Sequence, residues 1–128
     1  MKIDFYLLKE YEYKNNFLPL VLELLADDGD VKINDKLHLK EIRMLLNNQE
    51  IVNVYMTDSL SLKKNYCYIK KGNAKYYAIN LTDYFDDDIY ITSGSYEITI
   101  KTVIHELGSD GKNRIYEISS TKNLFIDL

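Results

Sequence analysis

The stretch YEITIKTVIHE at residues 96–106 alternates apolar and polar side chains along its whole length. Side chains two positions apart lie on the same face of a β-strand, so this pattern predicts a strand with one buried face and one mostly wet face. The predicted buried face holds Tyr96, Ile98, Ile100, Thr102 and Ile104, and the opposite face holds Glu97, Thr99, Lys101, Val103 and His105. A long strand of this kind is typical of antiparallel sheet.

The same period extends to both sides of this stretch. Val52, Val54 and Met56 alternate with polar neighbours, and residues 66–70 and 75–81 flank the turn Gly72-Asn73, which predicts a hairpin. Further strands are predicted at 89–92, 114–119 and 124–128. Short turns between consecutive strands predict an antiparallel meander of about five to seven strands over residues 50–128.

The first third of the chain shows helical spacing instead. Leu18, Val21, Leu22 and Leu25 predict a helix that begins near Pro19, and Leu39, Ile42, Leu45 and Leu46 predict a second helix over 39–47. Two alternatives stay open, a hairpin over 31–39 and either a strand or a helical turn at 3–8. The predicted fold class is α+β, with amino-terminal helices packed on one face of the sheet.

Length and composition indicate an ordinary globular chain. Its 128 residues, 46% hydrophobic and 28% charged, predict a single domain over 1–128. The longest apolar run, residues 17–26, is far short of the roughly 20 residues that span a bilayer, and no secretory leader is recognisable. We therefore expect a cytoplasmic protein without a membrane partner, whose only cysteine, Cys67, is buried.

No residue pattern indicates catalysis, a metal or a cofactor. The acidic run at 27–30 fails as a calcium loop because Lys32 and Leu39 stand where oxygen ligands are needed. His38 and His105 are too few to predict a metal centre. The expectation is a protein that is not an enzyme, although an unrecognised pair of catalytic carboxylates remains a third alternative.

Charge is distributed unevenly along the chain. Residues 1–30 carry three Lys and seven acids, residues 31–82 nine basic residues and four acids, and residues 83–128 four basic residues and nine acids, so the nets are −4, +5 and −5 and sum to the chain's −4. Such opposed fields mainly steer partners.

The sharpest acidic feature runs from Asp83 to Tyr90, and no cation follows until Lys101. Its candidate partner-binding residues are Asp83, Tyr84, Asp86, Asp87, Asp88 and Tyr90. Tyrosines are common hot-spot anchors and aspartates speed association with a basic surface, so this segment predicts a surface for a basic protein.

The basic counterpart lies in residues 63–77, where lysines alternate with tyrosines. Lysines and stackable rings on a hairpin predict, as the alternative function, a module that binds single-stranded nucleic acid. Against it stand a pI near 5.1 and only two arginines, Arg43 and Arg114, so nucleic acid is not the expected partner.

In size, acidity and lack of catalytic motifs the chain resembles the immunity proteins with which bacteria neutralise toxins, and the small inhibitors that phages use against host defences. The resemblance is of general character, and no functional positions carry over from it. It implies a binding protein that occludes a toxin or defence effector stoichiometrically.

Overall fold

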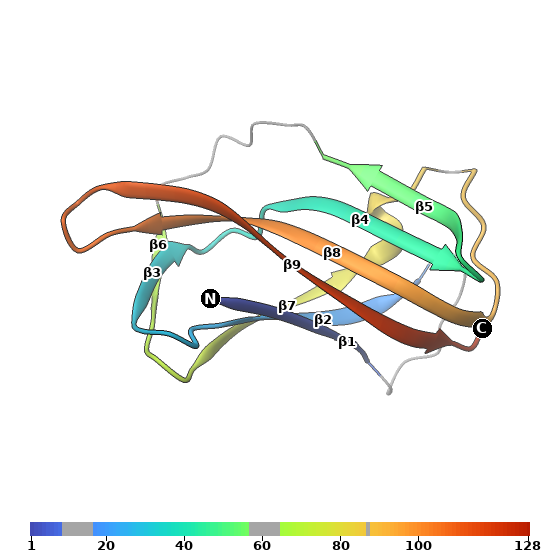
Figure 1. The fold of residues 1–128 in the computed structure, drawn as a ribbon, viewed down its shortest axis with the longest axis horizontal. Helices are drawn as coiled ribbons and strands as arrows, with labels where there is room; N and C mark the ends of the chain where they lie inside the picture. Colours follow the sequence, from blue (N-terminus) through green and yellow to red (C-terminus); the bar gives the residue numbers. More distant parts are fainter. Residues whose placement is uncertain (9–16, 57–64, 87) are drawn as a thin grey trace.

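The computed structural model describes residues 1–8, 17–56, 65–86 and 88–128, and its regular elements are strands and one 3-10 turn (Figure 1). The strands are β1 (Lys2–Leu7), β2 (Pro19–Leu25), β3 (Val31–Asn34), β4 (Leu39–Leu46), β5 (Gln49–Tyr55), β6 (Tyr66–Ile69), β7 (Ala74–Asn80), β8 (Gly94–Leu107) and β9 (Asn113–Ile126). The 3-10 turn, η1, spans Leu81–Tyr84. Among the described residues no helix is long and apolar enough to span a bilayer.

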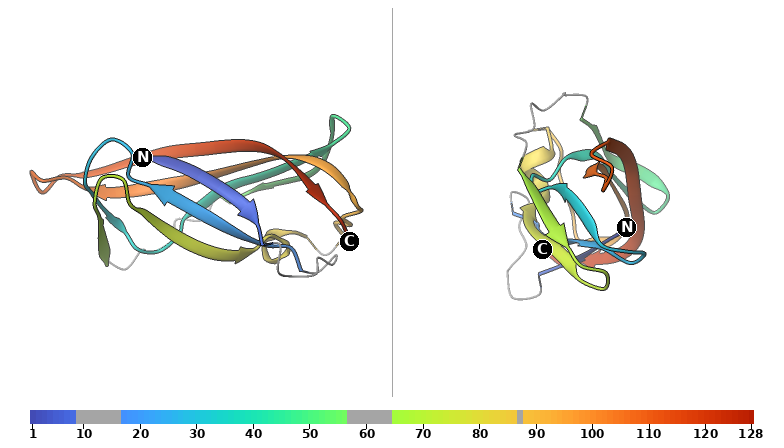
Figure 2. Two further views of the ribbon diagram at one scale, coloured as in Figure 1. Left: turned by 90° about the horizontal axis from the view of Figure 1, so that it is seen from below. Right: turned by 90° about the vertical axis from the view of Figure 1, so that its left-hand side faces the viewer.

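The strands form two antiparallel sheets that face each other as layers (Figure 2). The smaller sheet has three strands in the order β1-β2-β7. The larger sheet is built around β8, which pairs with β9 on one edge and with β3 and β4 on the other. β6 then pairs with β3, and β5 with β4.

One hydrophobic core lies between the two layers. β2 contributes alternate side chains from the small sheet and β8 does so from the large sheet; these core residues are Leu20, Leu22, Leu24, Ile98, Ile100 and Ile104. Each fully buried side chain of this size contributes on the order of 2 kcal/mol through the hydrophobic effect. The prediction for β8 is therefore confirmed, both as a strand and in the face that it buries.

The predicted helix at 18–25 is wrong, because these residues form β2. Leu18, Leu20, Leu22 and Leu24 are all buried, which is the period of a strand. The run is apolar almost throughout, so the helical and the strand periods both fit it, and pairing with β1 and β7 on both edges decides between them. Pro19 is tolerated as the first residue of the strand.

The predicted helix at 39–47 is also wrong, because these residues form β4. The pairing of β4 with β8 shifts between Leu39 and Glu41, so the buried residues are Leu39, Ile42 and Met44. A bulge of this kind inserts one extra residue, and here it produces a spacing of three that imitates a helix turn. The α+β fold class is therefore corrected to an antiparallel two-sheet architecture, and the described residues of the first third, 1–8 and 17–47, form strands and turns where helices were predicted.

Several pairings also differ from the predicted meander. The strands on either side of Gly72-Asn73 exist, but β6 pairs with β3 and β7 with β2, so they lie in different sheets instead of forming a hairpin. β3 likewise does not pair with β4, which rules out the hairpin at 31–39. Residues 89–92 are irregular, residues 2–7 are a strand, and the last two predicted strands are one, β9.

Candidate functional site

The acidic segment joins the two sheets, because it leaves β7 in the small sheet and enters β8 in the large one (Figure 1). Its first turn is capped by Asn80, whose Oδ1 accepts hydrogen bonds from the Leu18 amide (2.8 Å) and the Thr82 hydroxyl (2.9 Å). Asn80 Nδ2 also donates to Asp83 Oδ1 at 3.1 Å. Asn80 thus links the start of the acidic segment both to Leu18, which precedes β2, and to the η1 turn.

The far end of the segment is held by a buried tyrosine. The Tyr96 hydroxyl donates to the Thr92 carbonyl at 2.6 Å and accepts from the Thr92 amide at 3.2 Å. Ile91, one residue earlier, is buried in the core. Hydrogen bonds therefore hold the chain at both ends of the acidic segment.

The predicted site residues separate into exposed and packed side chains. Asp83, Asp86 and Asp88 are exposed, and Tyr90 is 75% exposed, more than any other large hydrophobic side chain in the described residues. Tyr84 is instead half-buried against the core, and burial, followed by the Asp83 charge, raises the pKa of its hydroxyl. Asp87 lies outside the described residues.

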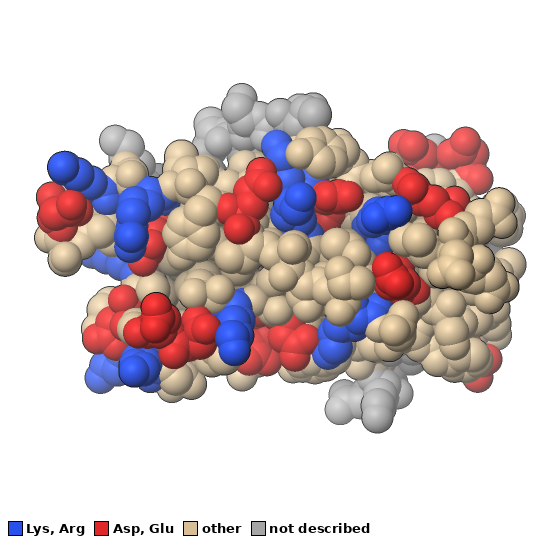
Figure 3. All heavy atoms as spheres, in the orientation of Figure 1, with Lys and Arg blue, Asp and Glu red and all other residues tan. Residues whose placement is uncertain are grey.

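The carboxylates of Asp86 and Asp88 are exposed to solvent. Neither forms an ion pair within the described ranges, whereas acids elsewhere do, as with Glu106 and Arg114 at 2.9 Å. Figure 3 shows acidic side chains gathered at the corner of the molecule where the 85–92 loop passes in Figure 1. In the part of the chain that the structure describes, an exposed tyrosine ring thus lies two residues from a carboxylate without an ion pair.

The lysine- and tyrosine-rich residues line a groove of about 590 Å³ at β6 and β7. Tyr68 and Tyr76 stand 59% and 60% exposed there, together with Lys70 and Lys75. Lys63 and Lys64, predicted to belong to this region, lie outside the described residues. Cys67 also lines the groove and is half-buried, so its predicted burial is only partial.

An acid from another loop is attached to this basic region. Asp30 accepts hydrogen bonds from the Lys71 amide (2.8 Å) and the Tyr68 hydroxyl (2.7 Å). The Lys71 bond, followed by the Tyr68 bond, lowers the pKa of Asp30, and the same contact raises the pKa of Tyr68. The fold therefore offsets part of the positive charge that the sequence concentrates at residues 63–77.

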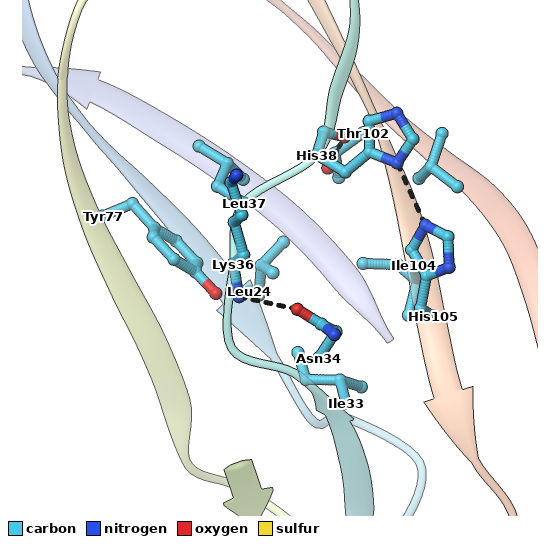
Figure 4. Close-up of a pocket in the computed structure, with 11 residues that line it drawn as sticks. Leu24, Ile33, Asn34, Lys36, Leu37, His38, Tyr77, Thr102, Ile104 and His105 are labelled. Carbon is cyan, nitrogen blue, oxygen red and sulfur yellow. Dashed lines mark hydrogen bonds between the residues drawn. The ribbon is translucent and has the colours of Figure 1, made fainter. Parts of the chain in front are cut away.

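His38 and His105, which no sequence pattern places together, meet at the gap between β3 and β4 (Figure 4). His38 Nδ1 and His105 Nε2 lie 3.0 Å apart, and the rings are 5.3 Å apart between centroids with planes inclined by 15°. Each ring thus points a nitrogen at the other, edge to edge. Burial lowers the pKa of both imidazoles, and for His38 the charges of His105 and Lys40 add to the effect.

The histidine pair borders a cavity of about 10 Å³, roughly the space of one water molecule. Asn34, Thr102 and Tyr77 also line this cavity. The alternation at 96–106 places His105 on the outer face of its strand, but no local pattern brings His38 beside it. In the described part of the chain, no group of three or more His, Cys, Asp or Glu residues could hold a metal ion.

Fold and surface together define the class of this protein: an antiparallel two-sheet β protein with an acidic, aromatic loop at one end. Comparison with protein-family models, curated proteins and solved structures found no match.

Proposed function

We propose that this chain binds a protein with a basic functional surface and blocks it stoichiometrically, as immunity proteins and phage inhibitors do. The observation that carries the proposal is Tyr90, which stands 75% exposed two residues after Asp88, a carboxylate that forms no ion pair with another described residue. A solvated turn that served only to connect two strands would need neither feature.

Three physical arguments support this surface. A tyrosine ring buried at the centre of an interface contributes large contact area with few rotatable bonds. Aspartates beside it raise the rate of encounter with a basic partner. The attachments at Asn80 and Tyr96 limit the conformational entropy that the segment loses on binding.

Affinity capture from the native cell tests the proposal. The bait is the full chain, and the comparison bait combines Asp86→Asn, Asp88→Asn and Tyr90→Ala. We expect one protein to co-purify in equal amount with the wild type and to be lost with the variant. Tyr55→Ala is the matched control, because Tyr55 is 55% exposed on β5. Equal capture by both baits would contradict the proposal.

A second candidate function, binding of single-stranded nucleic acid, is favoured by the exposed rings of Tyr68 and Tyr76 beside Lys70 and Lys75. Asp30 opposes it, because its carboxylate lies against the same surface. Fluorescence anisotropy with a labelled single-stranded oligonucleotide tests this function. Saturable binding that weakens with salt and with Tyr68→Ala would support it, and absence of binding at low salt would exclude it.

A further inference from the structure

β7 is an edge strand of the small sheet, where β2 is its partner among the described strands (Figure 1). In an antiparallel pair, the backbone groups of successive residues point alternately towards the partner strand and away from it. The Asn73 carbonyl, just before β7, accepts a hydrogen bond from the Ala26 amide at 3.0 Å, so the odd-numbered residues bond towards β2. The backbone N–H and C=O groups of Ala74, Tyr76 and Ala78 therefore point outwards, and they have no hydrogen-bond partner among the described residues.

Two hollows lie along this outward edge. The groove at β6 and β7 reaches the start of the strand, where Lys70, Lys75 and Tyr76 line it. A second hollow, of about 270 Å³, borders the end of the strand and is lined mainly by apolar side chains, Pro19 and Ile79 among them. One end of the edge is thus cationic and the other is apolar.

We propose that β7 accepts an extended peptide of a partner protein as an added antiparallel strand, with an acidic side chain at Lys75 and an apolar side chain at Ile79. These two residues lie on one face of β7, four positions and about 13 Å apart. An antiparallel peptide fits this spacing when its apolar residue precedes its acidic residue by four positions. In strand addition, main-chain hydrogen bonds give affinity and pockets for alternate side chains give selectivity. The inference does not depend on the function proposed for the acidic segment.

The charges along β7 favour this order of side chains. Lys75 Nζ lies 5.5 Å from the centroid of the Tyr77 ring, which holds the cation on the face that an added strand would cover. Within the described residues, neither Lys70 nor Lys75 forms an ion pair. At the other end Asn80 Nδ2 holds the Asp83 carboxylate at 3.1 Å, so a second carboxylate would be repelled there.

A peptide uses features of this edge that single-stranded nucleic acid would leave unused. Outward N–H and C=O groups match the main chain of a strand, whereas phosphate oxygens can only accept hydrogen bonds. The hollow at Ile79 has no cation among its described lining residues. The Asp30 carboxylate, bonded to the Tyr68 hydroxyl, repels a polyanion along the groove more than a single acidic side chain at Lys75.

The test is fluorescence anisotropy of the full chain with the labelled peptide Ser-Leu-Thr-Val-Thr-Glu-Thr-Ser, whose Leu and Glu have the required spacing. We expect saturable one-to-one binding. N-methylation of the three Thr amides, which would bond to Ala74, Tyr76 and Ala78, should weaken binding by roughly tenfold or more. N-methylation of the Val and Glu amides, which would point away from β7, should change it by less than about twofold.

Two variants of the chain test the same contacts from the other side. Lys75→Glu should weaken binding of this peptide by roughly tenfold and should bind the peptide with Lys in place of Glu instead. Lys112→Glu, at an exposed position in the turn between β8 and β9, is the matched control and should change neither interaction. Ala78→Pro removes an outward N–H that the pairing with β2 does not use, and it should also weaken binding.

Thermal unfolding shows whether each variant folds, and the comparison of N-methylated peptides needs only the wild-type chain. Equal effects of the two sets of N-methyl groups, or absence of saturable binding, would overturn the proposal. Failure of the Lys peptide to bind a folded Lys75→Glu chain would do so too. Labelled oligothymidine that binds more tightly than the peptide and displaces it would assign the edge to nucleic acid, which also overturns the proposal.

Discussion

The acidic segment and the lysine-rich segment have opposite charge in the sequence, and the fold treats them differently. Asp86 and Asp88 project from irregular backbone and make no ion pair among the described residues. At the lysine-rich segment, by contrast, Asp30 accepts hydrogen bonds from the Lys71 amide, 41 residues away in the chain, and from the Tyr68 hydroxyl, 38 residues away. The pairing of β3 with β6 thus places a carboxylate beside the lysine-rich segment, whereas within the described residues no cation forms an ion pair with Asp86 or Asp88.

The largest effect that we expect is on stability, and it should distinguish the two tyrosines of the acidic segment. Tyr84→Ala should lower the free energy of unfolding by about 2 to 3 kcal/mol, because a half-buried ring leaves a cavity in the packed edge of the core. Tyr90→Ala should leave it unchanged within about 0.5 kcal/mol, since this ring is exposed. Urea unfolding measures both. Equal destabilisation would show that Tyr90 is also packed.

Removal of Tyr90 should instead make the complex with the partner dissociate faster. Loss of a desolvated ring at a hot spot costs about 2 kcal/mol, which corresponds to roughly thirtyfold faster dissociation. Surface plasmon resonance with the captured partner measures this rate. Tyr55→Ala and Tyr68→Ala, which remove rings of comparable exposure elsewhere, should not change it. A larger effect from Tyr68 would move the interface to the lysine-rich segment.

Neutralising the acidic segment should mainly slow association. Asp86→Asn with Asp88→Asn removes two exposed charges, and we expect an association rate about tenfold lower at low salt with a flatter salt dependence. Asp28→Asn with Asp35→Asn makes the same charge change on exposed residues near β3 and should have a smaller effect. If both pairs slow association equally, net charge and not the acidic segment is responsible.

The smallest effect concerns Asp30. Its pKa lies below the ordinary 3.8, so its carboxylate stabilises the fold above that pH, and this contribution is lost as the pH falls through the lowered value. Asp30→Asn should therefore flatten the acid limb of the stability profile and return the pKa of Tyr68 towards its ordinary value. Spectrophotometric titration of tyrosine detects the second change. An unaltered tyrosine titration would mean that the Asp30 contact contributes nothing.

The sequence predicted an element correctly where the pattern of its own side chains was unambiguous, and failed where pairing with distant strands decided the structure. The strand at 96–106 was predictable because its apolar and polar residues alternate along its whole length. Residues 18–25 were not predictable, because an almost wholly apolar run fits both the helical period and the strand period. Residues 39–47 misled through a bulge, which becomes visible only once β4 is paired with β8. Long-range pairing also decides that β6 and β7 lie in different sheets.

The candidate site was likewise predictable only in part. Sequence indicated the acidic segment, but only packing distinguishes half-buried Tyr84 from exposed Tyr90. The histidine pair could not be predicted, since its members are 67 residues apart and meet at the gap between two strands that follow one another along β8.

Amide hydrogen exchange of the chain, with and without its stoichiometric partner, tests the central claim most directly. The partner is predicted to add protection at residues 88–95, where Tyr90 and the end of the acidic segment lie, and to leave residues 66–76 unchanged. New protection confined to 66–76, or none at 88–95, would contradict the proposal that this protein occludes its partner through the acidic segment.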